Sequence, residues 1–223
     1  PFLPNMATNA TVYISLALCI FMGYHVLNHL PIIDFRAYKV GTNITKGMEI
    51  PEGAPRDVVE MTFIYNVGGV DKEFTVEQVG NVPPDAKFVD RIDKVISKGY
   101  VPPIHDFTME KGGEDHASEL LAEPKLMMFV MYDLEKSSDD GLSKLAELAK
   151  TAQSKGYKVI AATSSGEDLI NGAKKKHNLG FDFYFCDPTT LKTIERANPS
   201  IVILNAGTIK QKVHFNDIDS LNL

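Results

Sequence analysis

The residues of this chain that could carry out covalent chemistry begin with its two cysteines, Cys19 and Cys186. A thiolate attacks disulfides and peroxides, so a reactive cysteine would make the protein a thiol reductase or peroxidase. Cys19 lies inside a long apolar stretch, where we expect an inert thiol. Cys186 precedes Asp187, whose charge would raise the thiol pKa. We therefore favour a small buried side chain at Cys186, and a peroxidatic thiol stays the alternative.

Histidines and acidic pairs indicate a site less strongly. His25 and His29 are four residues apart, so a helix would place both on one face. That spacing suits a metal or haem, but we favour polar anchoring at a membrane boundary. Asp139-Asp140 and Glu114-Asp115 would need burial to act as acid and base, and nothing in the sequence indicates burial. With no H-E-x-x-H, phosphate-binding glycine loop or G-x-S-x-G in the sequence, we expect no metal and no cofactor.

The N-terminal part of the chain carries no charge before Asp34. The apolar run from Ala10 to Leu30 is long enough for the helix of about 20 residues that crosses a hydrocarbon layer of about 30 Å. We predict a transmembrane helix there, in preference to a cleaved signal peptide or a buried core helix. Arg36 and Lys39 follow it, and the positive-inside rule alone would place the remaining residues in the cytoplasm.

The net charge of -6 argues against nucleic acid as a partner.

Three parts are expected along the chain: a membrane helix with its flanks (1–33), a connector (34–100) and an α/β domain (101–223). In the connector, residues 34–55 should be extended. Residues 61–67 and 70–79 flank Gly68-Gly69, which predicts a β-hairpin because glycine tolerates positive φ. Residues 88–99 fit a strand or a short helix.

The α/β domain should alternate strands and helices and then close with a hairpin, which gives a mixed sheet with flanking helices. Strands are predicted at 126–131, 157–163, 181–186, 200–204 and 208–215, and helices at 141–155, 166–177 and 188–197.

Several motifs in residues 101–215 resemble the thioredoxin-like fold of peroxiredoxins and membrane-anchored thioredoxins. They are PIHDFT (103–108), Glu119-Leu120-Leu121 with Lys125, Asn198-Pro199 before an apolar strand, and Gly207 in a hairpin turn. The resemblance implies a first strand at 103–108 and a cis-proline loop at Asn198-Pro199.

A second resemblance covers more of the chain. NHLPIIDFR (28–36), YKVG (38–41), GYVPPIHDF (99–107) and TTLKTI (189–194) are similar to a Bacteroidetes family of DoxX-type (MauE/DoxX-like) membrane proteins. In that family a four-helix membrane domain precedes one more helix and a thioredoxin-like domain. The resemblance implies that this chain corresponds to the C-terminal portion, in the inner membrane, with residues 34–223 in the periplasm. This reverses the orientation that the local charges favour.

The place where such a fold carries its Cys-x-x-Cys pair contains no cysteine. Aligning the helix by Leu142 and Leu145 puts Glu135, Lys136, Ser137 and Ser138 on the dithiol positions. Ser138 would cap the helix, with two aspartates in its first turn. Carboxylates there satisfy the helix dipole and oppose a thiolate.

Three hypotheses follow from these observations. The first is an accessory module that binds a protein or peptide next to the Pro199 loop, without redox chemistry, in an envelope redox or quinone-linked process. The second is a thiol peroxidase or reductase acting through Cys186. The third is a domain that only covers the membrane part.

Overall fold

The computed structural model describes residues 5–223, and the predicted flank at 1–4 lies outside them. The described residues divide into two compact units. One, the α/β unit, contains the residues up to Met48 together with Pro103–Leu223. The other, the hairpin unit, is Glu49–Pro102. These boundaries differ from the predicted connector at 34–100, and the reason is given below.

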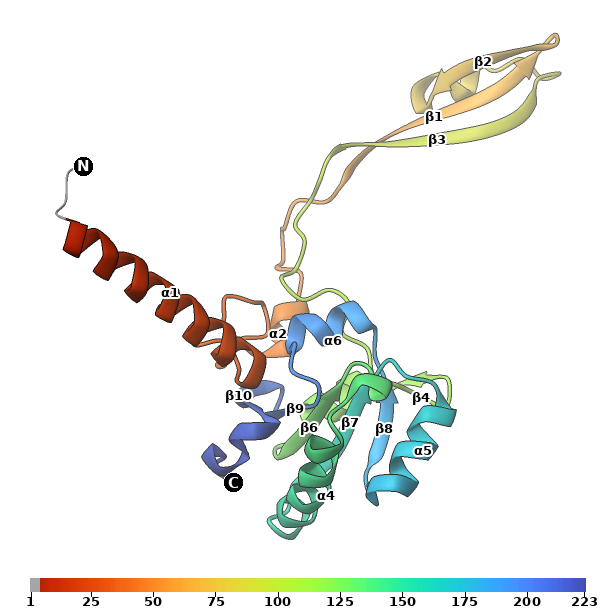
Figure 1. The fold of residues 1–223 in the computed structure, drawn as a ribbon. Coiled ribbons are helices and arrows are strands. Elements are labelled where there is room, and N and C mark those ends of the chain that lie inside the picture. Colours follow the sequence, from red (N-terminus) through yellow and green to blue (C-terminus); the bar gives the residue numbers. More distant parts are fainter. Residues whose placement is uncertain (1–4) are drawn as a thin grey trace. The chain divides into compact units, whose positions relative to one another are not determined.

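The sheet of the α/β unit has the strand order β10-β9-β6-β7-β8-β4-β5 (Figure 1). β6, β7 and β8 are parallel, whereas β9 runs antiparallel to β6 and to β10. This is the predicted mixed sheet of a thioredoxin-like fold. The strands are β4 (Glu110–Lys111), β5 (Glu114–Asp115), β6 (Leu126–Met131), β7 (Lys158–Thr163), β8 (Asp182–Phe185), β9 (Ser200–Asn205) and β10 (Thr208–His214).

Helices cover both faces of this sheet because β6 and β7 are apolar on both sides. Met127, Phe129 and Met131 of β6 pack with α4 in one core, whereas Leu126, Met128 and Val130 pack with α3 and α6 in the other. Such two-sided burial is what a nearly continuous apolar strand requires. The helices are α3 (Ala117–Ala122), α4 (Asp139–Ser154), α5 (Glu167–His177) and α6 (Pro188–Ile194), and the 3₁₀ turns are η2 (Leu134–Lys136) and η3 (Phe215–Ser220).

The segment from residue 34 to Met48 belongs to the α/β unit and not to the connector. Its short helix α2 (Ile44–Met48) buries Ile44 in the same core as Tyr38. The Ile44 amide donates to the Gly207 carbonyl in the β9–β10 turn at 2.8 Å. The prediction of an extended connector failed here because these contacts come from a hairpin far along the chain.

The first strand predicted at 103–108 is absent from the described α/β unit. Residues 103–108 form no ladder, and Pro102 and Pro103 lack the amide protons that a ladder needs. Ile104 and Phe107 are nevertheless buried, and the Ile104 amide donates to the Gly47 carbonyl at 3.1 Å. The segment therefore contributes side chains to the core without joining the sheet.

The hairpin unit is a sheet of order β2-β1-β3, with β1 (Val58–Val67), β2 (Val70–Thr75) and β3 (Lys87–Ser97); the 3₁₀ turn η1 (Val76–Asn81) follows β2. The predicted Gly68-Gly69 turn joins β1 and β2, with φ of 62° and 88° at the two glycines. Of the two alternatives predicted for residues 88–99, the helix is wrong and the strand is confirmed by β3. Its β-branched residues pair along β1, and a full ladder of backbone hydrogen bonds outweighs the local helical spacing.

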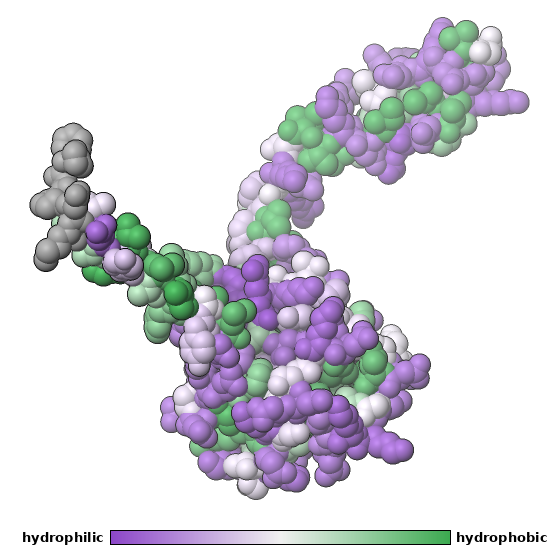
Figure 2. Space-filling view, viewed as in Figure 1, coloured by the Kyte–Doolittle hydropathy of each residue, from purple (hydrophilic) through white to green (hydrophobic). Residues whose placement is uncertain are grey.

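Helix α1 (Asn5–Asn28) is the predicted apolar helix, displaced by two residues at its end. Ala7–Asn28 is long and apolar enough to cross a membrane, and none of its most apolar window is buried within the structure. Figure 2 shows apolar side chains covering this helix, in contrast to the hydrophilic surface of the α/β unit. An apolar helix whose span is exposed in this way is suited to lipid.

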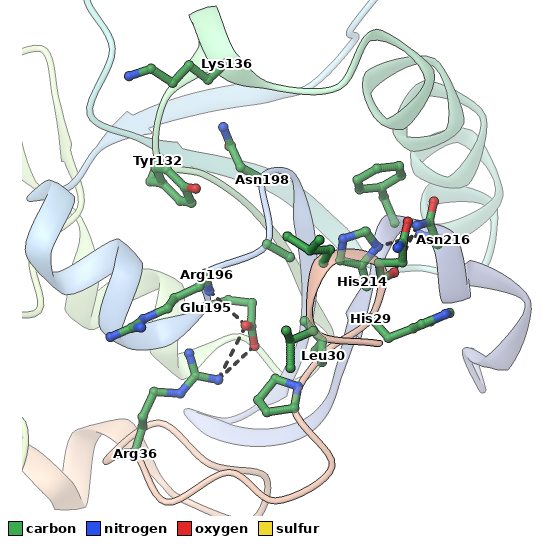
Figure 3. A pocket seen from close by; sticks show the side chains of 16 residues that line it. His29, Leu30, Arg36, Tyr132, Lys136, Glu195, Arg196, Asn198, His214 and Asn216 are labelled. Atoms are coloured by element: carbon green, nitrogen blue, oxygen red, sulfur yellow. Dashed lines mark hydrogen bonds and ion pairs between the residues drawn. The ribbon is translucent and has the colours of Figure 1, made fainter. Parts of the chain in front are cut away.

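A network of buried charges holds the segment after α1 against the rest of the α/β unit, and Figure 3 shows its Arg36–Glu195 pair. Arg36 lies 2.7 Å from Asp34 and 3.2 Å from Glu195, and the Lys212 ammonium lies 2.7 Å from Asp34 and 3.3 Å from Glu195. The Glu195 side chain is only 1% exposed. Two cations and two carboxylates balance, as burial requires, and removing one partner from such a network typically costs about 3–5 kcal/mol.

Asp34 should make the free energy of unfolding depend on pH in the acidic range. Burial acts to raise the pKa of Asp34, but hydrogen bonds from Arg36 and Lys212 outweigh it and hold that pKa well below its ordinary value. The stabilisation is therefore complete above the unfolded pKa of about 3.9 and is lost as the pH falls toward the folded pKa. We expect thermal unfolding of the detergent-solubilised chain to show this acid loss.

The comparison variant is Asp34→Asn, which should be less stable at pH 6 and lose less stability on acidification. Asp219→Asn, at an exposed residue, should keep the profile of the unsubstituted chain. Identical profiles for all three proteins would contradict the role given to Asp34.

Candidate functional site

The candidate site is the start of α4, where the chain leaves β6 through η2 and turns into the helix. Ser138 is the N-cap, and its Oγ accepts from the Gly141 amide at 3.1 Å. Ser138 is therefore the capping residue that the sequence predicts. The cap satisfies one of the free amides of the first turn with a residue of the chain itself.

The loop before β9 lies directly beside this helix start. The Asn198-Pro199 peptide bond is cis, as the resemblance implies. The Asn198 side chain donates to the Asp133 carbonyl at 2.6 Å, and the Ser137 hydroxyl lies 3.0 Å from both the Asn198 amide oxygen and that carbonyl. The structure therefore brings Ser137 and Ser138 together with Asn198 and Pro199.

Gly141 shows how closely the two elements approach. A Cβ built on Gly141 would lie 2.9 Å from two Pro199 ring carbons and 3.0 Å from the Phe215 ring. Real Cβ atoms essentially never come so close to a rigid ring, so only glycine fits without a shift of the backbone. Backbone and rings fill the position that a second active-site side chain would need.

The predicted dithiol positions Glu135 to Ser138 stay a prediction, and the observed helix start allows a second alignment one helical turn later. A thiolate needs the positive end of the helix, and the helix begins at Ser138. The Cys-x-x-Cys spacing then falls on Ser138 and Gly141. Glu135 and Lys136 instead belong to η2 and are exposed.

The first turn of α4 is anionic. Asp139 lies 2.7 Å from Lys176 and 3.0 Å from His177, and Asp140 lies 2.6 Å from Lys144. The hydrogen bond from Lys176 lowers the pKa of Asp139, so this carboxylate is charged near neutral pH. Two carboxylates at a helix N-terminus complement its dipole and repel a further anion such as a thiolate.

Cys186 lies far from solvent in the core that contains Tyr38 and Phe107. Burial and the charge of Asp187 raise the pKa of its thiol to about 12. A thiol that is inaccessible and protonated is a poor nucleophile, so the structure supports the buried side chain over the peroxidatic alternative.

His25 and His29 lie at the end of α1, with ring centroids 5.2 Å apart. His29 Nδ1 is 2.8 Å from Asp217 of η3, which ties the helix end to the α/β unit. Within residues 5–223, no group of three or more His, Cys, Asp or Glu side chains is placed to share a metal ion.

Sequence reasoning missed Gly141, Glu195 and His214. Glu195 follows Leu191 by four residues and so continues the buried stripe of α6, which was a usable signal. Gly141 and His214 depend on neighbours from other parts of the chain, and no local pattern marks them.

A family model described as a domain of unknown function (DUF8463) matches residues 59–98, inside the hairpin unit. No curated protein matches the chain.

Similar solved structures include reduced Prx3 from Vibrio vulnificus in complex with hydrogen peroxide, at 14% identity and a TM-score of 0.39, covering 48% of this chain and 81% of that one. The thioredoxin domain of a thiol-disulfide oxidoreductase from Bacteroides vulgatus has 12% identity and a TM-score of 0.38, covering 47% and 80%. StoA from Bacillus subtilis has 16% identity and a TM-score of 0.36, covering 48% and 84%.

The contact at Gly141 yields a test by substitution. Gly141→Ala should lower the free energy of unfolding by about 1 kcal/mol, because overpacking costs about 1–3 kcal/mol and the helix propensity of alanine returns up to about 1. Gly172→Ala in α5 is the matched control, since nothing lies within 4 Å of its added Cβ. It should stabilise the chain by up to about 1 kcal/mol. Equal effects of the two substitutions in urea unfolding would contradict the close packing.

Proposed function

We propose that this chain is a membrane-anchored thioredoxin-like module without dithiol chemistry, which binds a protein partner. In this proposal it is the accessory part of a DoxX-type membrane protein and acts in an envelope redox or quinone-linked process. Its helix α1 would lie in the inner membrane, and residues 34–223 would lie in the periplasm.

The observation that carries the proposal is the packing of Gly141 against Pro199 and Phe215 at a helix start capped by Ser138. Thioredoxin chemistry needs an exposed thiolate at that helix end. Here the cap, the anionic first turn and the two rings occupy the same place. Of the two cysteines, Cys19 lies in α1 and Cys186 is buried.

Support for anchoring comes from α1. Its side chains are exposed over a span of 22 residues with a mean hydropathy of 1.8. Leaving so much apolar surface in water would cost free energy in proportion to its area, and a lipid bilayer removes that cost.

Support for a partner surface comes from the loops beside the closed site. Glu135 and Lys136 are exposed on η2, and Asn198 is half-buried next to them. We define the partner surface as Glu135–Ser138 and Asn198-Pro199. Loops held rigidly by Asp133 can present polar groups to an extended peptide at little entropic cost.

Site-specific photo-crosslinking tests the partner surface. A photoreactive residue replaces Glu135 in the chain expressed with its natural upstream sequence in membranes, and we expect one discrete protein adduct. The matched control replaces Lys150, an exposed residue of α4 outside the partner surface, and should give no such adduct. Equal adducts at both positions, or none at either, would favour a domain that only covers the membrane part.

Two assays on the same membranes address the enzyme alternative. The chain should not reduce insulin disulfides, and hydrogen peroxide should not form a sulfenic acid at Cys186. A positive result in either assay would overturn the proposal.

A further inference from the structure

A pocket of about 660 Å³ lies within the α/β unit, between the end of α1, the loop before β9 and the end of β10 (Figure 3). It touches the partner surface at Lys136 and Asn198, but most of its lining comes from elsewhere. Its size is within the range of about 300–1,000 Å³ that is typical of small-molecule sites. The two sides of this pocket differ sharply in chemistry.

One side is apolar and continues the surface of α1. Val26, Leu27, Leu30 and Pro31 line it. Leu27 is 79% exposed, although it lies only one residue before the end of the span that could cross a membrane. If α1 is in a bilayer, this side of the pocket lies at the depth where acyl chains meet lipid headgroups.

The other side carries excess positive charge. Among the described residues that line the pocket, the cations Arg36, Lys136 and Arg196 outnumber the single carboxylate of Glu195. Arg36 is satisfied by Asp34 and Glu195, and Lys136 pairs with Asp133 at 2.7 Å.

Arg196 differs from these two cations, because within residues 5–223 no carboxylate forms an ion pair with its guanidinium. Figure 3 shows the Arg196 and Arg36 guanidinium groups on the same side of the pocket. Arg196 is therefore a positive charge available to a ligand.

His214 adds a fixed hydrogen-bond donor. Its side chain lines the pocket and the residue is only 6% exposed. Nδ1 accepts from the Asn216 amide at 3.1 Å, so the proton of the neutral ring is on Nε2. Burial lowers the pKa of His214, which keeps the ring neutral. Within residues 5–223 no hydrogen bond joins Nε2 to another residue, so its proton is available to a ligand in the pocket.

We propose that this pocket binds the phosphate headgroup of an anionic membrane phospholipid, with its acyl chains along Val26 and Leu27. Arg196 pairs with the phosphate, and His214 Nε2, on the other side of the pocket, donates to an ester oxygen of the same lipid. The proposal goes beyond partner binding and rests on the proposed membrane anchoring. Charge selects an anionic lipid over a zwitterionic one, and the apolar side selects a lipid over free phosphate.

Lipid exchange tests the proposal on the full chain in detergent. The chain is equilibrated with equal amounts of phosphatidylglycerol and phosphatidylcholine, and native mass spectrometry measures the retained lipid. We expect phosphatidylglycerol to dominate. Arg196→Ala should reduce its retention about tenfold, the size expected for losing one charge-assisted hydrogen bond. Arg56→Ala, which removes an exposed arginine of the hairpin unit, should change nothing.

The remaining outcomes separate the alternatives. Equal retention of both lipids, or an equal effect of the two arginine variants, would overturn the proposal. Displacement of phosphatidylglycerol by excess inorganic phosphate would also overturn it, because the pocket would then be a site for the free anion. Failure of membrane anchoring is recognised separately, by release of the chain from membranes in alkaline carbonate.

Discussion

The contact of Gly141 with the Pro199 ring is the constraint on which the rest of the site depends. It fixes how closely the start of α4 approaches the loop before β9. At this distance no side chain fits between the two elements, and the Ser138 hydroxyl takes the place of an external ligand at the helix end. Aspartates then complete the first turn. Each of these features alone would weaken thiol chemistry, and together they leave neither space nor favourable charge for a thiolate.

The end of α1 differs from the start of α4 in how its charged groups are paired. The network of Asp34, Arg36, Glu195 and Lys212 is balanced internally, which allows it to be buried and to hold the segment after α1 on the α/β unit. Next to it, Arg196 and the His214 Nε2 proton remain available. At the start of α4, the polar groups are thus paired with other residues of the chain. In the pocket beside α1, a guanidinium and a ring N–H have no such partner among the residues that the structure describes. This difference separates the closed helix start of α4 from the open pocket beside α1.

The elements with strong local patterns could be predicted from the sequence. β6 was bounded correctly because six apolar residues follow one another, and the hairpin at Gly68-Gly69 followed from glycine conformation. The failures share one physical cause, which is that distant contacts decided the outcome. β3 is a strand because β1 pairs with it, and Glu195 is buried because Arg36 arrives from 159 residues away. The dithiol positions Glu135 to Ser138 stay a prediction, because helical periodicity alone also allows an alignment one turn later.

The most direct test of the closed, anionic site is the thiol pKa of a cysteine placed at its cap. Ser138→Cys is made with Cys19→Ser, so that buried Cys186 is the other thiol and should not react. The pH dependence of alkylation gives the pKa. We predict a value at or above the free-cysteine value of about 8.5, falling when Asp139→Asn and Asp140→Asn are added. A pKa below about 7 with both aspartates present would contradict the account, because thioredoxin-like active-site cysteines have such values.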